Sequence, residues 1–222
     1  MFYILRILIF LLILNVTGCK YFAQRIKSNM SSAKKNINCF VDVEKKKNVL
    51  RVLVMPVANS SNEKSIENTV YDSMILSFSK FNYFEVSKYS DFPEETIKAL
   101  EDSFKYKSRG VINKEPVKQF GQDFKIDAII FPEVFIYRAY NPLLLGYKHF
   151  MFNTIETDVV WSVDDTMDMG NSAVNTLARN WYYKNYRDNY NPSLKSDIME
   201  FSMSYFVNFS MDAFFETWKK TA

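Results

Sequence analysis

Three aspartates near the end of a predicted strand form the densest group of acidic side chains in the chain. Asp164, Asp165 and Asp168 lie in the run Asp-Asp-Thr-Met-Asp. Their carboxylates could bind Ca²⁺ or Mg²⁺, or act as the acid and base of a hydrolase. The first two point to opposite faces if the strand continues through them, and the run lacks the glycine and spaced acids of a calcium loop. We expect solvation and helix capping, with a metal site or a hydrolase as alternatives.

His149 is the only histidine and the only candidate imidazole for catalysis. It stands between Lys148 and Phe150 in a predicted apolar strand, and the sequence contains no nucleophile-elbow pattern that would supply a serine. One histidine and two cysteines cannot assemble the usual zinc site within one chain, and the glycines are too far apart for a phosphate-binding loop. We expect a structural or surface histidine, no enzymatic activity, no bound metal and no cofactor.

Aromatic side chains are interleaved with basic ones in residues 181–190. Such side chains anchor protein interfaces or stack on sugars. The alternative is that Trp181 and its neighbours Leu177 and Tyr182 pack inward while the others are ordinary surface groups. The residues predicted to contact a partner are Trp181, Tyr183, Tyr186, Tyr190 and, on the helix that follows, Phe206.

An apolar run and a cysteine mark the N-terminal segment. Residues 7–14 are apolar and follow Arg6, a length typical of a signal-peptide core and shorter than the roughly 20 residues of a membrane-spanning helix. The run Val16-Thr17-Gly18-Cys19 resembles the bacterial lipobox. The resemblance implies that residues 1–18 are a lipoprotein signal peptide and that Cys19 becomes the acylated N-terminus. An ordinary secretory signal with a chance cysteine is the alternative.

Lipid at Cys19 predicts a protein anchored to a membrane of the bacterial cell envelope. Two or three acyl chains hold a protein firmly, whereas one holds it only marginally. Lys20 follows the cysteine, and in enteric bacteria a residue other than aspartate there is typical of sorting to the outer membrane. We expect placement in the outer membrane, facing the periplasm, with surface display as the alternative. Residues 19–47, rich in Lys, Asn and Ser, are expected to form a flexible tether.

Composition predicts one folded domain over residues 48–222. The chain has 222 residues, of which 48% are hydrophobic and 17% aromatic, and this excludes a disordered protein. Its 28 basic and 25 acidic residues nearly balance and form no basic stripe, so we expect no nucleic-acid binding. With Cys19 acylated, Cys39 has no partner for an intramolecular disulfide. We expect Cys39 to be partly buried on a short edge strand, with an intermolecular disulfide as the alternative.

Hydrophobic patterns predict alternating strands and helices. Runs rich in β-branched residues indicate strands, and apolar residues spaced by three or four indicate helices. Pro132 removes a hydrogen-bond donor from its strand and favours a bulge or an edge position there. Few glycines argue against an all-β fold, so we expect an α/β fold with a mixed sheet and flanking helices. The expected elements are strands 49–55, 83–87 and 127–137, helices near 66–78, 93–104 and 116–124, a hairpin over 147–166 that turns near 156–157, and helices 172–187 and 194–219.

Three stretches resemble motifs of one group of envelope proteins. They are the strand and polar exit at 52–59, the strand entry at 124–130, and the run 141–147 followed by 157–162. Together they are similar to the TolB N-terminal-like domain, shared by CsgG-type secretion lipoproteins and by lipoprotein activators of penicillin-binding proteins. The likeness covers residues 49–170 and departs at Asp158, where the family's turn usually carries glycine. The resemblance implies an α/β domain that acts through protein contacts.

The sequence thus predicts a lipid-anchored, non-catalytic protein-binding module of the periplasm. Its expected partners are the membrane, through lipid at Cys19, and another envelope protein, through the C-terminal helices and residues 181–190. Two alternatives stay open. One is an envelope hydrolase that uses Asp164, Asp165 and Asp168, and the other is a structural lipoprotein that binds peptidoglycan.

Overall fold

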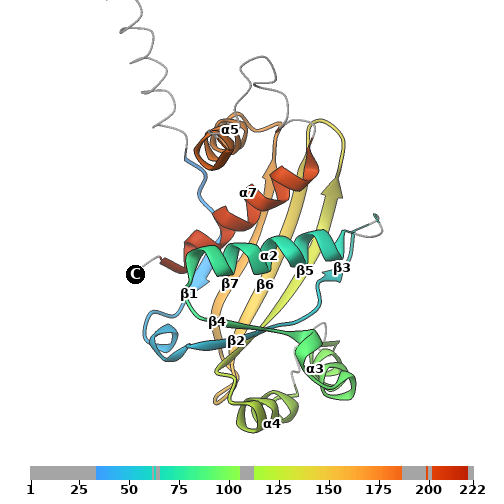
Figure 1. The fold of residues 1–222 in the computed structure, drawn as a ribbon, viewed down its shortest axis with the longest axis vertical. Helices are drawn as coiled ribbons and strands as arrows, with labels where there is room; N and C mark the ends of the chain where they lie inside the picture. Colours follow the sequence, from blue (N-terminus) through green and yellow to red (C-terminus); the bar gives the residue numbers. More distant parts are fainter. Residues whose placement is uncertain are drawn as a thin grey trace, which may run out of the picture.

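A computed structural model describes residues 34–61, 63, 66–105, 113–186, 199 and 202–219 of the chain. Cys19, the predicted signal peptide and Tyr190 lie outside these ranges. The described residues form one mixed β-sheet with helices packed against it (Figure 1). The expected α/β fold with a mixed sheet is therefore confirmed.

The sheet has seven strands in the order β1-β7-β6-β5-β2-β4, with β3 paired to β5. β2 runs parallel to both β4 and β5, whereas β5, β6, β7 and β1 pair successively in antiparallel fashion. The predicted hairpin is the β6–β7 pair. The strands are β1 Cys39–Val41, β2 Arg51–Val54, β3 Ala58–Asn59, β4 Glu85–Lys88, β5 Ala128–Arg138, β6 Leu144–Asn153 and β7 Val159–Asp168.

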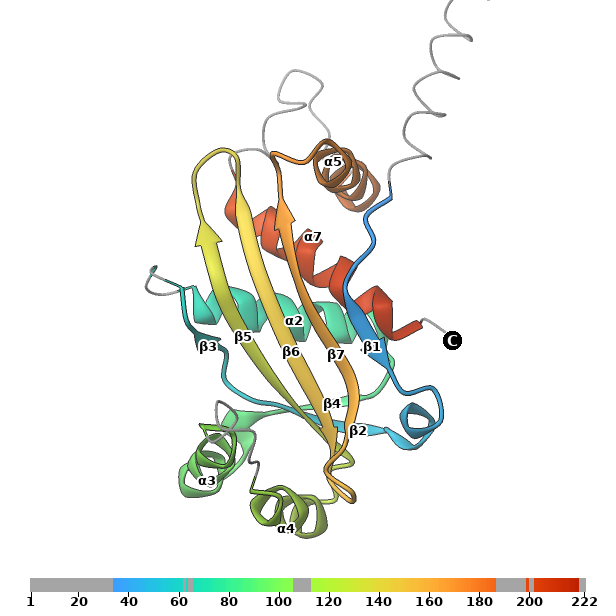
Figure 2. The ribbon, with the colours of Figure 1, turned by 180° about the vertical axis from the view of Figure 1, so that it is seen from behind.

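Helices cover one face of the sheet and both of its ends. α2 and α7 cross that face, α5 lies at one end, and α3 and α4 lie at the other (Figure 1). Seen from behind, β5, β6 and β7 have no described helix in front of them along most of their length (Figure 2). None of the helices in the described ranges is both long and apolar enough to cross a bilayer. The helices are α2 Glu67–Phe81, α3 Glu94–Lys105, α4 Glu115–Phe124, α5 Ser172–Tyr186 and α7 Met203–Phe215, with short 3₁₀-helices η1 Lys45–Asn48, η2 Tyr89–Asp91 and η6 Glu216–Lys219.

The larger core lies between the sheet and the pair α2 and α7. Phe78 of α2 and Phe215 of α7 stack with ring centroids 4.1 Å apart, over the fully buried Trp161 of β7. The indole Nε1 of Trp161 donates a hydrogen bond to Thr217 Oγ1 at 3.0 Å, so its one polar group is satisfied. A smaller core, which includes Leu100 and Phe120, lies beneath α3 and α4. Aromatic packing thus fixes α7 on the sheet.

The folded domain begins before residue 48, earlier than the sequence predicts. β1 pairs with β7, with Cys39 opposite Val163. Lys35 Nζ lies 2.7 Å from an oxygen of Asp165, an ion pair that holds the chain just before β1. Residues 35–47 are therefore part of the domain and do not form a free tether. Cys39 is partly buried on an edge strand, as expected.

Pro132 lies in an inner strand of the sheet rather than at its edge. The amide of Met55 donates to Ile130 O and that of Ser60 donates to Val134 O, so alternate residues of β5 direct their backbone groups toward β2 and β3. Pro132 lies between these two bonds, where β2 has ended and β3 has not begun. Its missing donor costs no ladder bond there. The β5 bulge comes later, after Val134.

The last helix is shorter than the predicted range 194–219. α7 begins at Met203, and Ser202 before it is extended, with φ −106° and ψ 99°. The apolar sequence pattern continues across Ser202 because side chains are buried both before it, at Met199, and after it, in α7. Only Met199 is described among residues 187–201, and it is also buried.

In the β6–β7 turn, the residue with a left-handed backbone conformation lies one position before Asp158, the residue at which the family's turn usually carries glycine. Thr157 has φ 60°, whereas Asp158 does not take a positive φ. The side-chain oxygen of Asn153 accepts hydrogen bonds from the amides of Glu156 (2.6 Å) and Thr157 (3.1 Å), which stabilises the turn. Asp158 instead forms an ion pair with Lys45 at 2.5 Å.

His149 is a core residue. Its ring is fully buried and lies 4.2 Å, between centroids, from the ring of Trp161. Neither ring nitrogen has a hydrogen-bond partner among the residues that the structure describes. Burial lowers the pKa of His149 to about 3, because the charged imidazolium would lose its hydration. The imidazole is therefore neutral at physiological pH and has a structural role.

We predict that His149 makes the domain less stable in acid. The unfolded chain binds a proton at this side chain below its ordinary pKa of 6.5, whereas the folded chain does not until about pH 3. Stability from this group is thus present above pH 6.5 and falls as the pH decreases, by about 2 kcal/mol at pH 5. Denaturant unfolding of wild type and of His149→Phe at pH 7.5 and pH 5 measures this, and the variant should lose less stability. Equal losses in the two proteins would contradict the prediction.

Candidate functional site

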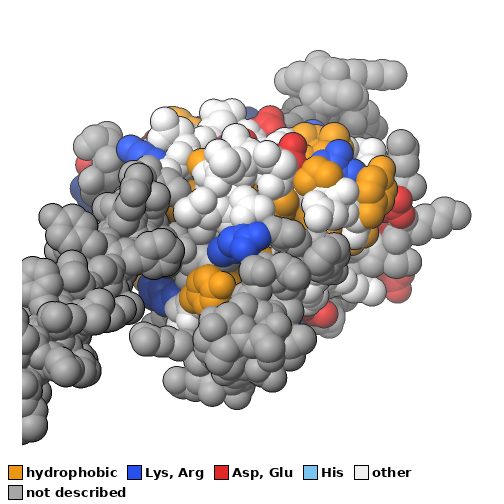
Figure 3. All heavy atoms as spheres, turned by 90° about the horizontal axis from the view of Figure 1, so that it is seen from above, with side chains coloured by type: hydrophobic (Ala, Val, Ile, Leu, Met, Phe, Trp, Pro, Cys, Tyr) orange, Lys and Arg blue, Asp and Glu red, His pale blue; other side chains and the backbone are white. Residues whose placement is uncertain are grey.

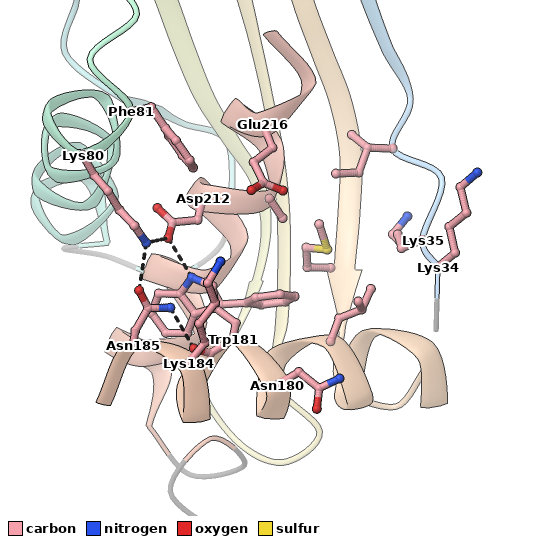
Figure 4. A pocket seen from close by; sticks show the side chains of 15 residues that line it. Lys34, Lys35, Lys80, Phe81, Asn180, Trp181, Lys184, Asn185, Asp212 and Glu216 are labelled. Carbon is pink, nitrogen blue, oxygen red and sulfur yellow. Dashed lines mark hydrogen bonds and ion pairs between the residues drawn. The ribbon is translucent and has the colours of Figure 1, made fainter. Parts of the chain in front are cut away.

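A cavity of about 450 Å³ lies between α5, α7, the C-terminal end of α2 and the segment before β1. We call it the α5–α7 pocket. Its volume falls within the range of roughly 300–1,000 Å³ that is usual for ligand sites. Figure 4 shows its lining side chains. The apolar part of the wall consists of Ile37, Phe81, Met167, Leu177, Trp181, Phe209 and Ala213.

A buried carboxylate joins three helices at one wall of the pocket. Asp212 of α7 has a side chain only 9% exposed. Its Oδ1 accepts a hydrogen bond from Ser77 Oγ of α2 at 2.7 Å, and its Oδ2 accepts one from Trp181 Nε1 of α5 at 2.7 Å. Lys80 of α2 completes the set as an ion pair with Asp212. Because a buried charge is costly unless it is paired and hydrogen-bonded, these donors fix how the three helices pack.

Lys80 connects the same wall to the end of α5. Its Nζ donates to Asn185 Oδ1 at 3.0 Å and lies 5.6 Å from the centroid of the Trp181 ring. Asn185 Nδ2 in turn donates to the backbone oxygen of Trp181 at 2.7 Å. The indole is thus held at its polar end by Asp212 and on its face by the lysine. Figure 4 shows these side chains together on one side of the pocket.

Lysines also border the opposite side of the pocket. Lys35 is bound to both oxygens of Asp165, at 2.7 and 2.9 Å. Lys34 and, across the pocket on α5, Lys184 are exposed, and neither has an ion-pair partner among the residues that the structure describes. A view of the molecule from above shows basic and hydrophobic side chains next to one another (Figure 3). The pocket therefore combines an apolar interior with a partly basic border.

The structure brings some of the predicted contact residues to this region. Trp181 lines the pocket, and Tyr186 packs edge-on against its ring with centroids 5.8 Å apart. Tyr183 is partly exposed on α5. Phe206 is fully buried in the core, so it contributes no surface to a partner and is corrected to a packing residue. Tyr190 lies outside the described residues.

Sequence reasoning missed Asp212 and Lys80, which shape the pocket wall. Asp212 is the one acidic residue within the apolar helix α7. A single carboxylate on a helix that is apolar nearly all round must be bonded or exposed, and this is the pattern that could have identified it. Nothing comparable distinguishes Lys80 from other surface lysines.

The aspartate cluster is used in structural contacts. β7 continues through Asp164 and Asp165, so their side chains point to opposite faces, as the sequence predicts. Asp165 binds Lys35 and accepts from the amide of Asn38 at 3.0 Å, and Asp168 accepts from the amide of Gly170 at 2.8 Å. Within the described ranges no three His, Cys, Asp or Glu side chains are grouped as a metal site would require.

We predict that Asp212→Ala lowers the free energy of unfolding by about 3 kcal/mol. The change removes the acceptor of Ser77 and Trp181 and leaves two buried donors unsatisfied, whereas Lys80, at 42% exposed, loses only a solvent-accessible ion pair. Denaturant unfolding of the full chain at pH 7 measures it. The matched control is Asp164→Ala, an exposed aspartate whose loss should change stability by no more than about 0.5 kcal/mol. Similar values for both variants would show that the Asp212 junction is not structural.

No protein-family model and no curated protein matches this chain. Solved structures similar to it include the PelC dodecamer from Paraburkholderia phytofirmans, at 9% identity over 84% of this chain and 99% of that chain, with a TM-score of 0.49. Lipoprotein GNA1162 from Neisseria meningitidis is 17% identical over 61% of this chain and 96% of that chain, with a TM-score of 0.38. The LpoB C-terminal domain from Salmonella enterica is 10% identical over 53% of this chain and 81% of that chain, with a TM-score of 0.36. Because all three TM-scores are below 0.5, the architecture given above rests on this chain's own strand pairing and packing.

Proposed function

We propose that this protein is a lipid-anchored, non-catalytic binding module of the bacterial cell envelope. It is acylated at Cys19, sits in the outer membrane facing the periplasm, and binds another envelope protein at the α5–α7 pocket. The observation that carries the proposal is the pocket itself, which has Trp181 in its wall and lies beside the segment that leads back toward Cys19.

The composition of the pocket suits a protein interface. Tryptophan is enriched among the residues that contribute most to binding, and interfaces combine an apolar centre with a polar rim. Trp181 is held in one orientation by Asp212 and Lys80, so little conformational entropy is lost when a partner packs against it. The carboxylates of Asp165 and Asp168 are bonded to the protein's own amides, which favours binding over catalysis as the role of the domain.

The chain length between the anchor and the pocket supports contact with other envelope proteins. Residues 19 and 34 are 15 positions apart, a distance that a fully extended chain spans in at most roughly 50 Å. The domain can therefore reach partners within that distance of the membrane. Because the chain reaches the domain at one border of the pocket, a bound partner also contacts the segment that carries the tether.

The proposal extends to membership in the TolB N-terminal-like group. Two features support it: the motifs at 52–59, 124–130 and 141–147, and the order of the elements. That order is β2, α2, β4, then α3 and α4, and then the antiparallel strands β5, β6 and β7. In this group, the domain acts through protein contacts, in agreement with a binding role.

We predict that a photo-crosslinking amino acid at Tyr183 captures one recurrent envelope protein in intact cells. Tyr183 is partly exposed on α5 near the pocket, so a partner bound there comes within reach of the crosslinker. Mass spectrometry of the adducts identifies the partner. The control carries the same crosslinker at Lys98, which is exposed on α3 at the other end of the domain. Scattered abundant proteins from both positions would refute the proposed binding site.

We predict that Cys19→Ser abolishes incorporation of radiolabelled palmitate, whereas Cys39→Ser leaves it intact. Cys39 is the matched control because it is the only other cysteine and lies on β1 of the folded domain. Labelling of growing cells followed by immunoprecipitation measures both variants. Label retained by the Cys19→Ser chain would contradict lipid anchoring at that residue.

A further inference from the structure

We infer that the α5–α7 pocket takes a peptide segment in which carboxylates flank an apolar side chain. The apolar side chain occupies the cavity, and the carboxylates pair with Lys34 and Lys184. The inference rests on the proposed function and names the chemistry of the partner at that site.

The interior of the cavity favours an apolar group. Residues from four different parts of the fold meet there, among them Ile37, Phe81, Leu177 and Phe209. A volume of about 450 Å³ corresponds to roughly 15 water molecules in the bulk liquid. Displacing water from these apolar walls with a hydrocarbon or aromatic side chain is favourable. The cavity therefore has room for a large apolar side chain and part of the backbone that carries it.

Most of the charge on the pocket wall is neutralised within the protein, and the remainder is mainly positive. Lys35 is paired with Asp165, and Lys80 is paired with Asp212. Among the described residues, the charged side chains on the wall without an ion-pair partner are Lys34, Lys184 and Glu216. Two cations against one anion leave a positive surplus that complements an acidic ligand.

The two unpaired lysines lie on opposite sides of the cavity. Lys34 belongs to the segment before β1, whereas Lys184 belongs to the last turn of α5 (Figure 4). An apolar side chain seated between them has a cation on either side. Carboxylates placed on both sides of that apolar residue can therefore each approach one lysine, and this spacing defines the proposed ligand.

The polar part of the wall favours a peptide over the acyl chain of a lipid. Lys80 is 42% exposed, and it uses two of its three N–H donors on Asp212 and Asn185. A hydrocarbon chain that covered Lys80 would offer no acceptor to the third donor, and burial of a polar group without compensation is costly. A C=O group of a peptide backbone can accept from it.

A photo-reactive peptide tests the inference on the full chain in phosphatidylcholine nanodiscs. The probe is acetyl-Gly-Asp-benzoylphenylalanine-Asp-Gly-amide, and the matched probe has Asn in place of each Asp. We expect adducts of the acidic probe to map to residues that line the pocket, such as Leu177. The yield of adducts should be about tenfold lower with the Asn probe than with the acidic probe. It should also be about tenfold lower when the acidic probe is used with a chain that carries both Lys34→Glu and Lys184→Glu. Lys98→Glu with Lys118→Glu, on α3 and α4, should leave the yield unchanged.

Three results would overturn the inference. They are equal yields from the two probes, a yield unaffected by the reversal of Lys34 and Lys184, or adducts that map away from the pocket. A phosphatidylglycerol vesicle with a photo-reactive acyl chain provides the competing test. If it labels the pocket in a lysine-dependent manner while the acidic peptide does not, the ligand is an anionic lipid. None of these results decides the proposed function, because that is tested separately by the Tyr183 crosslink in cells. The outcome of that crosslink does not depend on the chemistry of the peptide.

Discussion

The need to satisfy the carboxylate of Asp212 controls how the helices pack at the candidate site. α7 is otherwise largely apolar and lies across the sheet, so its one acid is almost completely removed from water. Donors from α2 and α5 compensate for that burial: Ser77, Lys80 and Trp181 all bond to the same carboxylate. The three helices are thereby held in one relative arrangement. The α5–α7 pocket is the space that this arrangement leaves between them and the segment before β1.

The segment before β1 links the sheet and the pocket. Lys35 pairs with Asp165 of β7, and two residues later Ile37 contributes to the pocket wall. The same carboxylate accepts the amide of Asn38, which places β1 in register against β7. The chain that arrives from the predicted lipid site is therefore fixed to the sheet before the first strand. The pocket is therefore bounded by the folded domain and by this segment together.

Of the polar side chains that could have carried chemistry, Asp165, Asp168 and His149 are bonded or buried. Asp165 and Asp168 accept hydrogen bonds from nearby amides, and Asp164 faces solvent on the other side of the same strand. His149 packs among aromatic rings with a strongly lowered pKa, so it cannot act as a base that exchanges protons with solvent. The α5–α7 pocket, in contrast, combines apolar walls with exposed lysines at its border.

The sequence by itself determined the longer strands, most of the helices and the mixed α/β architecture, whereas the two-residue strand β3 was not predicted. Two runs over residues 147–166 that turn near 156–157 indicated the β6–β7 hairpin, and the spacing of apolar residues indicated α2, α3 and α4, because periodicity records which face is buried. The apolar strand around His149 indicated a structural or surface residue, and the structure shows that it is buried. Only the tertiary structure decided that Phe206 is core rather than surface, because α7 is apolar on both faces and its pattern cannot distinguish burial from a binding face. It also decided the partners of Asp212, which are 135 residues away at Ser77 and 31 at Trp181, and the partner of Lys35, which is 130 away. A polar side chain's partner depends on how distant elements pack, and local spacing carries no record of that.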